Sequence, residues 1–278
     1  MICDLHTHSI YSDGTYSPAE IIDEAIKIGL SAVALTDHNT VDGLKDFISS
    51  ARGKKIEIVP GAEFSVDYEG TELHLLGLFI KPEHFNAVSE LMLSVNKSKE
   101  ESNLALIQSL SLAGYPLDYE AIKGKTPNGK VNRSQIADAM LEKGYVISKD
   151  VAFATYLSPE AGHYKESKRL TAMEMIDFIK SIDAVPVLAH PFLNLDEKDK
   201  VMKFLRSAKE RGLVGMECYY STYSEETTQM ALRAANELGL VPSGGSDFHG
   251  AAKADISLGR GKGSLKVPFE SYLRLKNS

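Results

Sequence analysis

Residues 2–38 read ICDLHTHSIYSDGTYSPAEIIDEAIKIGLSAVALTDH and contain a strand, a loop, a helix and a second strand in succession. The apolar runs at 2–6 and 31–36 predict the two strands. Between them, Ser17 is followed by Pro and, three positions later, by Glu, which is the pattern of a capped helix start. Gly29 follows the last residue of the helical spacing and marks the helix end. This stretch predicts one βα unit and the start of the next.

Short apolar runs alternate with helical patterns through most of the chain, as expected for βα units and a mostly parallel sheet. Seven such strands suit an α/β barrel, and a chain of 278 residues is long enough to form one. The predicted strands are 2–6, 31–36, 56–60, 72–80, 185–190, 214–219 and 240–243.

The stretch 86–167 breaks this alternation, because it has helical patterning and loop signals but no clear β run. We expect a barrel domain formed by 1–85 and 168–278. The stretch between them is expected to be a mainly helical insertion, serving as a lid or substrate-binding subdomain.

Composition excludes several classes of protein. The 31 Lys and Arg against 38 Asp and Glu give a net charge of −7, which argues against stable nucleic-acid binding. No apolar run approaches the roughly 18 residues that a membrane span needs. The first residues lack the basic flank and apolar stretch of a secretory signal, so we expect a cytoplasmic protein. Cys3 and Cys218 form no metal-binding spacing and are expected in the core.

Imidazole and carboxylate side chains collect near the ends of the predicted strands. His6 and His8 are two apart on the first strand and therefore share a face. In parallel α/β barrels the carboxyl ends of the strands build the active site, so residues far apart in the sequence converge there. The candidates are His6, His8, Asp13, His38, Glu63, His74, His190, Asp247 and His249.

This mixture of donors predicts a metal site. Nine candidate ligands are too many for one tetrahedral ion and enough for two or three divalent ions that share a bridging carboxylate. Histidine with carboxylate suits Mn, Fe or Zn better than Ca or Mg. Three divalent ions against three carboxylates would leave a formal charge of about +3, which would hold a phosphate dianion. A small phosphorylated substrate is therefore the expected partner, despite the negative net charge.

The sequence resembles the PHP (polymerase and histidinol phosphatase) superfamily of metal-dependent phosphoesterases. The matching motifs are DLHTHSIYSDG at 4–14, LTDHNT at 35–40, PGAEFS at 60–65, LHLLGLFI at 73–80, AHP at 189–191 and GSDFH at 245–249. The resemblance covers roughly 1–85 and 170–265. It implies a distorted (β/α)₇ TIM-like barrel with a trinuclear site.

The resemblance also implies which residues hold each metal. His6, His8, Glu63 and Asp247 would hold the first, and Glu63 would bridge to a second held by His74 and His190. Asp13, His38 and His249 would hold the third.

The insertion resembles that of one branch, the stand-alone nucleoside 3′,5′-bisphosphate phosphatases and a related 5′→3′ exoribonuclease. There a Gly-Arg-Pro-His type segment opens the last helix of the insertion, and here Arg133 is kept while the Gly, Pro and His are not. Arg133 and Lys165 could bind a phosphate group, or they could be solvated residues of a charged lid. The segment GRGKG at 259–263 lacks phosphate-loop spacing, so we expect a turn with Arg260 as a weaker substrate contact.

The resulting hypothesis is hydrolysis of a small phosphomonoester, such as a nucleoside 3′,5′-bisphosphate, by a metal-bridging hydroxide. The residues expected to carry catalysis are Asp37, His38 and Glu63. Glu63 and His38 act as metal ligands, while Asp37 orients a neighbouring ligand or handles a proton.

Three alternatives stay open at this stage. A 5′→3′ exonuclease on short oligonucleotides would need stacking aromatics, for which Tyr219, Tyr220 and Tyr223 are candidates, although packing explains them equally well. An amidohydrolase-type C–N hydrolase shares the His-x-His pair, but the carboxylate-containing third site suits phosphate. A metal-binding module without turnover would not require the complete ligand set.

Overall fold

The protein is represented by a computed structural model, which describes residues 1–126, 131–165, 167, 170–195 and 198–278. Contacts between residues divide the chain into two compact units, Met1–Ser89 with Leu170–Ser278, and Glu90–Arg169. The predicted boundary between 167 and 168 falls beside residues 166, 168 and 169, which lie outside the described residues. Each unit has a hydrophobic core of its own.

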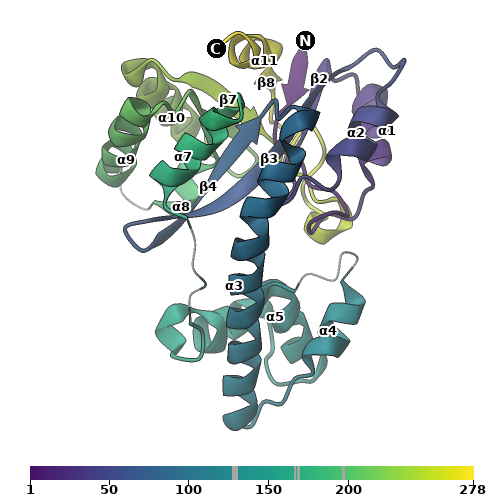
Figure 1. The fold of residues 1–278 in the computed structure, drawn as a ribbon, viewed down its shortest axis with the longest axis vertical. Helices are drawn as coiled ribbons and strands as arrows, with labels where there is room; N and C mark the ends of the chain where they lie inside the picture. Colours follow the sequence, from purple (N-terminus) through teal and green to yellow (C-terminus); the bar gives the residue numbers. More distant parts are fainter. Residues whose placement is uncertain (127–130, 166, 168–169, 196–197) are drawn as a thin grey trace. The chain divides into compact units, whose positions relative to one another are not determined.

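The larger unit is built on an eight-stranded sheet that curls into a nearly closed barrel (Figure 1). The strands are β1 (Ile2–Asp4), β2 (Ala32–Leu35), β3 (Glu57–Tyr68), β4 (Thr71–Leu78), β5 (Val185–Leu188), β6 (Gly215–Tyr220), β7 (Val241–Gly245) and β8 (Val267–Pro268). Their order across the sheet is β7-β6-β5-β4-β3-β2-β1-β8.

Backbone hydrogen bonds between the first and the seventh strand segments close the barrel. The amide of Leu5 donates to the carbonyl of Gly244 over 3.2 Å, and the amide of Asp247 donates to the carbonyl of His6 over 2.9 Å. Only glycine fits at position 245, because an added Cβ would lie 2.3 Å from the Cβ of His6. The α/β barrel predicted from the sequence is confirmed.

The pairing of β3 and β4 differs from the mostly parallel sheet that the sequence predicted. β3 is a long strand that continues past the predicted 56–60 and pairs antiparallel with β4. Glu69 and Gly70 form the two-residue turn between them, with φ of 51° and 83°, as a type I′ turn requires. β4 also pairs antiparallel with β5. Because β4 starts where the parallel strands end, its early residue His74 still lies at the end of the barrel that carries the other candidate ligands.

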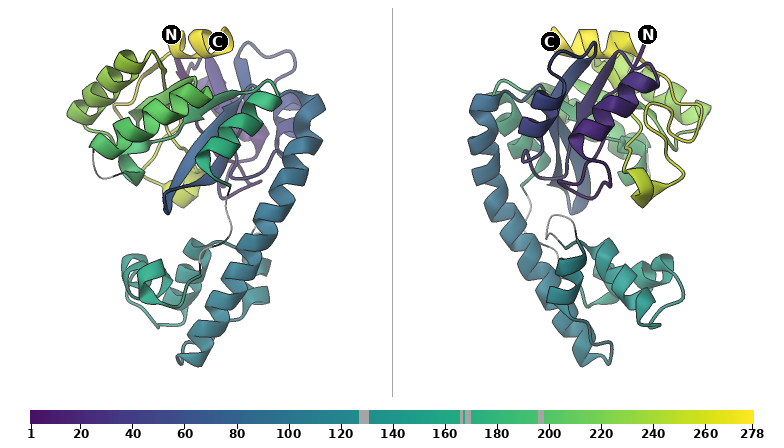
Figure 2. Two further views of the ribbon diagram at one scale, coloured as in Figure 1. Left: turned by 60° about the vertical axis from the view of Figure 1, so that its left-hand side comes forward. Right: turned by 90° about the vertical axis from the view of Figure 1, so that its right-hand side faces the viewer.

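Helices cover the outside of the barrel (Figures 1 and 2). Capping boxes start two of them as the sequence pattern predicts, at Ser17 with Glu20 and at Thr171 with Glu174. The main helices of this unit are α1 (Pro18–Lys27), α2 (Leu44–Ser50), α7 (Ala172–Ser181), α9 (Lys198–Arg211), α10 (Glu225–Leu238) and α11 (Phe269–Lys276). Shorter helical segments are η1 (Pro82–His84), α8 (Pro191–Asn194) and η4 (Gly250–Lys253).

The barrel interior is packed with apolar side chains from successive strands. Leu5, Val59, Leu76 and Val187 are all fully buried in one cluster, and Tyr272 of α11 joins it. Cys3 and Cys218 are free and buried, as predicted. Such packing fixes the strand ends, and with them the polar side chains that follow.

The smaller unit is helical, and its described residues contain no strand. Its core includes the fully buried Leu106, Leu110, Ile136 and Met140. Its helices are α3 (Phe85–Leu112), which begins in the larger unit, α4 (Tyr119–Lys125), α5 (Arg133–Glu142) and α6 (Lys149–Ala152), followed by η2 (Phe153–Leu157) and η3 (Pro159–Ala161). None of the described helices in either unit is both long and apolar enough to cross a lipid bilayer.

Candidate metal centre

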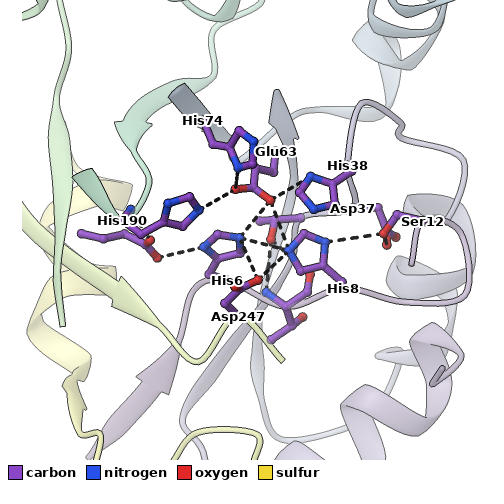
Figure 3. Close-up of polar contacts among 12 residues, drawn as sticks. His6, His8, Ser12, Asp37, His38, Glu63, His74, His190 and Asp247 are labelled. Atoms are coloured by element: carbon purple, nitrogen blue, oxygen red, sulfur yellow. Dashed lines mark hydrogen bonds and ion pairs between the residues drawn. The ribbon is translucent and has the colours of Figure 1, made fainter. Parts of the chain in front are cut away.

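The nine predicted metal ligands converge at one end of the barrel. Figure 3 shows those that surround Glu63. They come from the segments after β1, β2, β5 and β7 and from within β3 and β4. Contrary to expectation, Glu63 lies inside β3 rather than after a strand, because that strand is longer than predicted. The candidate ligands form four overlapping groups: His8, Asp13, His38 and His249; His6, Glu63 and His190; His6, His8 and Asp247; and His38, Glu63 and His74.

Glu63 is the centre of this arrangement. Its Oε1 lies 2.8 Å from Nδ1 of His74 and 3.1 Å from Nε2 of His190. Its Oε2 lies 3.0 Å from Nδ1 of His38 and 3.2 Å from Nε2 of His6. The two oxygens therefore face different sets of imidazoles, which is the geometry that a bridging carboxylate needs.

Two buried carboxylate oxygens lack the hydrogen bonds that burial normally requires. Among the described residues, Glu63 Oε2 and Asp13 Oδ1 are buried without a hydrogen-bond partner, although imidazole nitrogens lie close to both. Nε2 of His6 and Nε2 of His8 also point at each other over 3.0 Å. Buried polar atoms left unpaired are costly, and divalent cations would satisfy these oxygens and nitrogens together. The donor set fits a metal centre.

Burial and mutual attraction shift the pKa values of these groups. Burial opposes protonation of His8 and His74, but nearby carboxylates, including Glu63, raise the pKa of His8 to about 9 and of His74 to about 10. Burial would raise the pKa of Glu63, yet the imidazoles of His38 and its other neighbours keep that pKa well below its usual value. Burial lowers the pKa of His38 to about 3, against the opposite effect of Glu63. Without metal, protons on His8 and His74 therefore neutralise buried negative charge.

Outer contacts turn several imidazoles toward the centre. Nδ1 of His190 donates to Oδ1 of Asn194 over 2.8 Å, and Nδ1 of His249 donates to the carbonyl of Asp247 over 2.8 Å. Nδ1 of His6 donates to Oε1 of Glu217 over 3.0 Å. In each case Nε2 is the ring atom that faces the other candidate ligands. Histidines that bind metals are commonly oriented in this way by a hydrogen bond from their other ring nitrogen.

Glu217 is not among the site residues predicted from the sequence. This residue lies in β6 and is fully buried. A single carboxylate within the strand sequence GMECYY was the available signal, because a buried strand does not keep a charge without partners.

Asp247 has different partners on its two oxygens. Its Oδ2 accepts from the hydroxyl of Tyr220 over 2.7 Å and pairs with Nζ of Lys253 over 2.6 Å. Its Oδ1 faces Nε2 of His8 over 3.2 Å. Tyr220 and Lys253 therefore leave one oxygen of Asp247 available for a cation.

The three tyrosines considered as base-stacking residues are engaged in packing. Tyr220 is buried against His190, with ring centroids 5.2 Å apart. The hydroxyl of Tyr223 accepts from the amide of Phe192 over 2.9 Å. Tyr219 packs against the barrel core. These contacts favour the packing interpretation.

Asp37 is directed away from His38, toward the loop after β1. Its Oδ1 accepts from the amide of Ser9 over 2.7 Å and from the hydroxyl of Ser12, and its Oδ2 accepts from the hydroxyl of Ser9 over 2.7 Å. This loop connects His8 to Asp13, so Asp37 contacts the chain between two candidate ligands.

The predicted substrate contacts lie outside the four ligand groups. Arg133 starts α5 of the helical unit, donates to the carbonyl of Leu157 over 3.2 Å and lies 4.3 Å from the ring centroid of Tyr164. Lys165 is exposed in the same unit. Arg260 is exposed on a turn of the barrel unit, as the sequence predicted for GRGKG.

Comparisons with known proteins agree with this geometry. A family model described as PHP domain matches residues 4–147. The 5′-3′ exoribonuclease of Haemophilus influenzae is 30% identical over 246 residues, which span 88% of this chain and 89% of that protein. The 3′,5′-nucleoside bisphosphate phosphatase of Chromobacterium violaceum is 26% identical over 257 residues, 92% of this chain and 90% of that protein.

A solved structure from Bifidobacterium adolescentis, described as a metal-dependent phosphoesterase, has a TM-score of 0.83 with this chain at 23% identity. The match covers 98% of this chain and 94% of that one. The likeness shows that the two proteins share their fold.

Proposed function

Because the chain belongs to the PHP domain family of metal-dependent phosphoesterases, we propose that its substrate is a small phosphomonoester, a nucleoside 3′,5′-bisphosphate or a similar nucleotide. The observation that carries this proposal is the set of nine convergent ligands around Glu63, with two buried carboxylate oxygens that lack hydrogen bonds. Such a set suits two to three divalent ions, which in bound form supply an acidic water and neutralise phosphate oxygens.

The side chains of this chain would hold the ions and exclude water from the site. Glu63 presents one oxygen to His74 and His190 and the other to His6 and His38, so it would hold divalent ions together with both sets of imidazoles. Burial excludes bulk water from His6, His8 and Glu63, which strengthens every electrostatic interaction with an anionic substrate.

The charge of the protein and the packing of its tyrosines support a small substrate. A net charge of −7 opposes binding of a long polyanion, so the attraction for phosphate must be local to the metal centre. Tyr220 and Tyr223 are committed to contacts around His190 and Phe192 rather than to an open stacking surface.

We further propose that Arg133, Lys165 and Arg260 contact the substrate. The fork of Arg133 suits bidentate binding of a phosphate group, and its stacking on Tyr164 orders the side chain beforehand. Arg133→Met would then raise KM several-fold with the metal content unchanged, and an unaltered KM would remove Arg133 from the substrate contacts.

A second candidate is a 5′→3′ exonuclease on short oligonucleotides, because the Haemophilus influenzae relative carries that name. A C–N hydrolase is less well supported, since the group of His8, Asp13, His38 and His249 adds a carboxylate-containing site suited to phosphate.

The decisive experiment measures phosphate release by metal-analysed, Mn-reconstituted protein. The panel contains nucleoside 3′,5′-bisphosphates, mononucleotides, histidinol phosphate and short oligonucleotides. Release from a small monoester that is abolished by chelation and by His38→Ala supports the proposal. Mononucleotides released only from oligonucleotides would select the exonuclease. Release of neither phosphate nor mononucleotides from any substrate by fully metal-loaded protein would reject both.

A further inference from the structure

Glu217 is a buried carboxylate that none of the four ligand groups includes. It lies in β6 between apolar neighbours and has no exposed surface. An ionised carboxylate in such a place requires strong hydrogen bonds, so its partners indicate its purpose.

The two oxygens of Glu217 bind two different candidate ligands. Oε1 accepts from Nδ1 of His6 over 3.0 Å, and Oε2 accepts from the backbone amide of His190 over 2.8 Å. His190 has a φ of 27°, which is unfavourable for a residue with a side chain. The bond from Glu217 thus stabilises a strained backbone that carries one ligand, while it orients the ring of another.

The bond to His6 also decides which ring nitrogen carries the proton. A carboxylate can only accept, so Nδ1 of His6 must be the protonated atom. In the metal-bound state Nε2 would then supply its lone pair to the cation, and it lies 3.0 Å from Nε2 of His8 and 3.2 Å from Oε2 of Glu63. That tautomer is the one that can bind a cation at this position.

We propose that Glu217 is a positioning residue of the metal centre, which fixes the Nδ1–H tautomer of His6 and the backbone of His190 at the same time. Its carboxylate thereby links His6, which the resemblance assigns to the first metal, with His190, which it assigns to the second. This inference deepens the proposed function and rests on its metal centre.

The variant Glu217→Gln tests this role because glutamine has nearly the same shape but only one acceptor oxygen. If that oxygen binds the amide of His190, the NH₂ group faces Nδ1 of His6 and moves the ring proton to Nε2. If the side chain turns over, the NH₂ group faces the amide of His190, and two donors oppose each other. Either arrangement disturbs one ligand, and we expect metal affinity to fall about 10–100-fold.

The experiment titrates Zn²⁺ and Mn²⁺ into the metal-free full-length chain by calorimetry, and records ¹⁵N NMR spectra of the histidine rings. The matched control is Glu83→Gln, because Glu83 is exposed in η1 and belongs to none of the four ligand groups. We expect the control to retain wild-type affinity within about twofold.

Wild-type affinity in Glu217→Gln, together with an unchanged His6 tautomer, would overturn the proposal. If the variant does not fold, the Zn-loaded wild-type chain decides, since His6 must then show a proton on Nδ1 and metal on Nε2. A proton on Nε2 would overturn it. Neither measurement uses a substrate, so a wrong proposal about the substrate would leave these results unaffected.

Discussion

Replacing Asp37 with asparagine separates a positioning role from a catalytic one. Asp37 is buried and accepts from the amide of Ser9 and from the hydroxyls of Ser9 and Ser12. Asparagine keeps one acceptor oxygen and the shape of the side chain. It loses the negative charge and turns one acceptor into a donor.

The size of the effect follows from these bonds. A hydrogen bond to a charged group contributes about 1.5–3 kcal/mol and a neutral one about 1 kcal/mol. Ser9 can rotate its hydroxyl to accept from the new NH₂ group, so we expect a net loss of about 2 kcal/mol. For a unit of this size that loss lowers Tm by about 4–8 °C.

The loop held by Asp37 links His8 to Asp13, so its loosening must affect the group formed by His8, Asp13, His38 and His249. We expect Asp37→Asn to lower metal content and phosphate release together. The assays are thermal unfolding, metal analysis and phosphate release on the same preparations. The exposed Asp199→Asn provides the matched control, with a change below about 0.5 kcal/mol.

One result would refute this reasoning. Wild-type Tm and full metal content, with activity lost, would mean that Asp37 handles a proton and does not act by positioning the loop.

Three further predictions concern the metal centre. His249→Ala should remove about one metal ion per chain in elemental analysis, and an unchanged count would remove His249 from the ligand set. Carboxylates raise the pKa of His8 to about 9 and of His74 to about 10, so both carry protons at neutral pH that metal must displace. Metal affinity should therefore rise from pH 7 to pH 9, with proton release detectable by calorimetry in buffers of different ionisation enthalpy, and a flat profile would contradict this. Gly14→Ala should weaken metal binding at least tenfold, because the new Cβ would lie 2.3 Å from the carbonyl oxygen of His8; binding as in the wild type would show that the loop tolerates the shift.

The barrel and the gathering of the nine candidate ligands could be predicted because each depends on local pattern. Apolar runs set the strands, and polar residues placed next to them had to meet at one end of the sheet. The direction of β4 could not be obtained in this way, because an apolar run reads the same in parallel and antiparallel sheets. Only the turn at Glu69 and Gly70 distinguishes the two, and Glu-Gly is a weaker turn signal than Asn-Gly.

Contacts at a distance set the remaining features of the site. Glu217 reaches His6 from a strand more than two hundred residues later in the chain, and no local pattern relates them. The partners of Asp37 were likewise missed, because serine residues occur in many loops and the sequence does not show which of them face a buried carboxylate.

The bonds that close the barrel also determine when the metal centre can form during synthesis. The amide of Leu5 donates to the carbonyl of Gly244, and the amide of Asp247 donates to the carbonyl of His6. Leu5 and His6 therefore have to wait for the synthesis of their partners near the end of the chain. At translation rates of about 5–20 residues per second, that wait lasts on the order of tens of seconds. Throughout it one edge of β1 stays unpaired, and a ribosome-bound chain that ends before β7 has neither a closed barrel nor Asp247 and His249. The complete set of nine candidate ligands can therefore come together only late in synthesis, when the barrel closes.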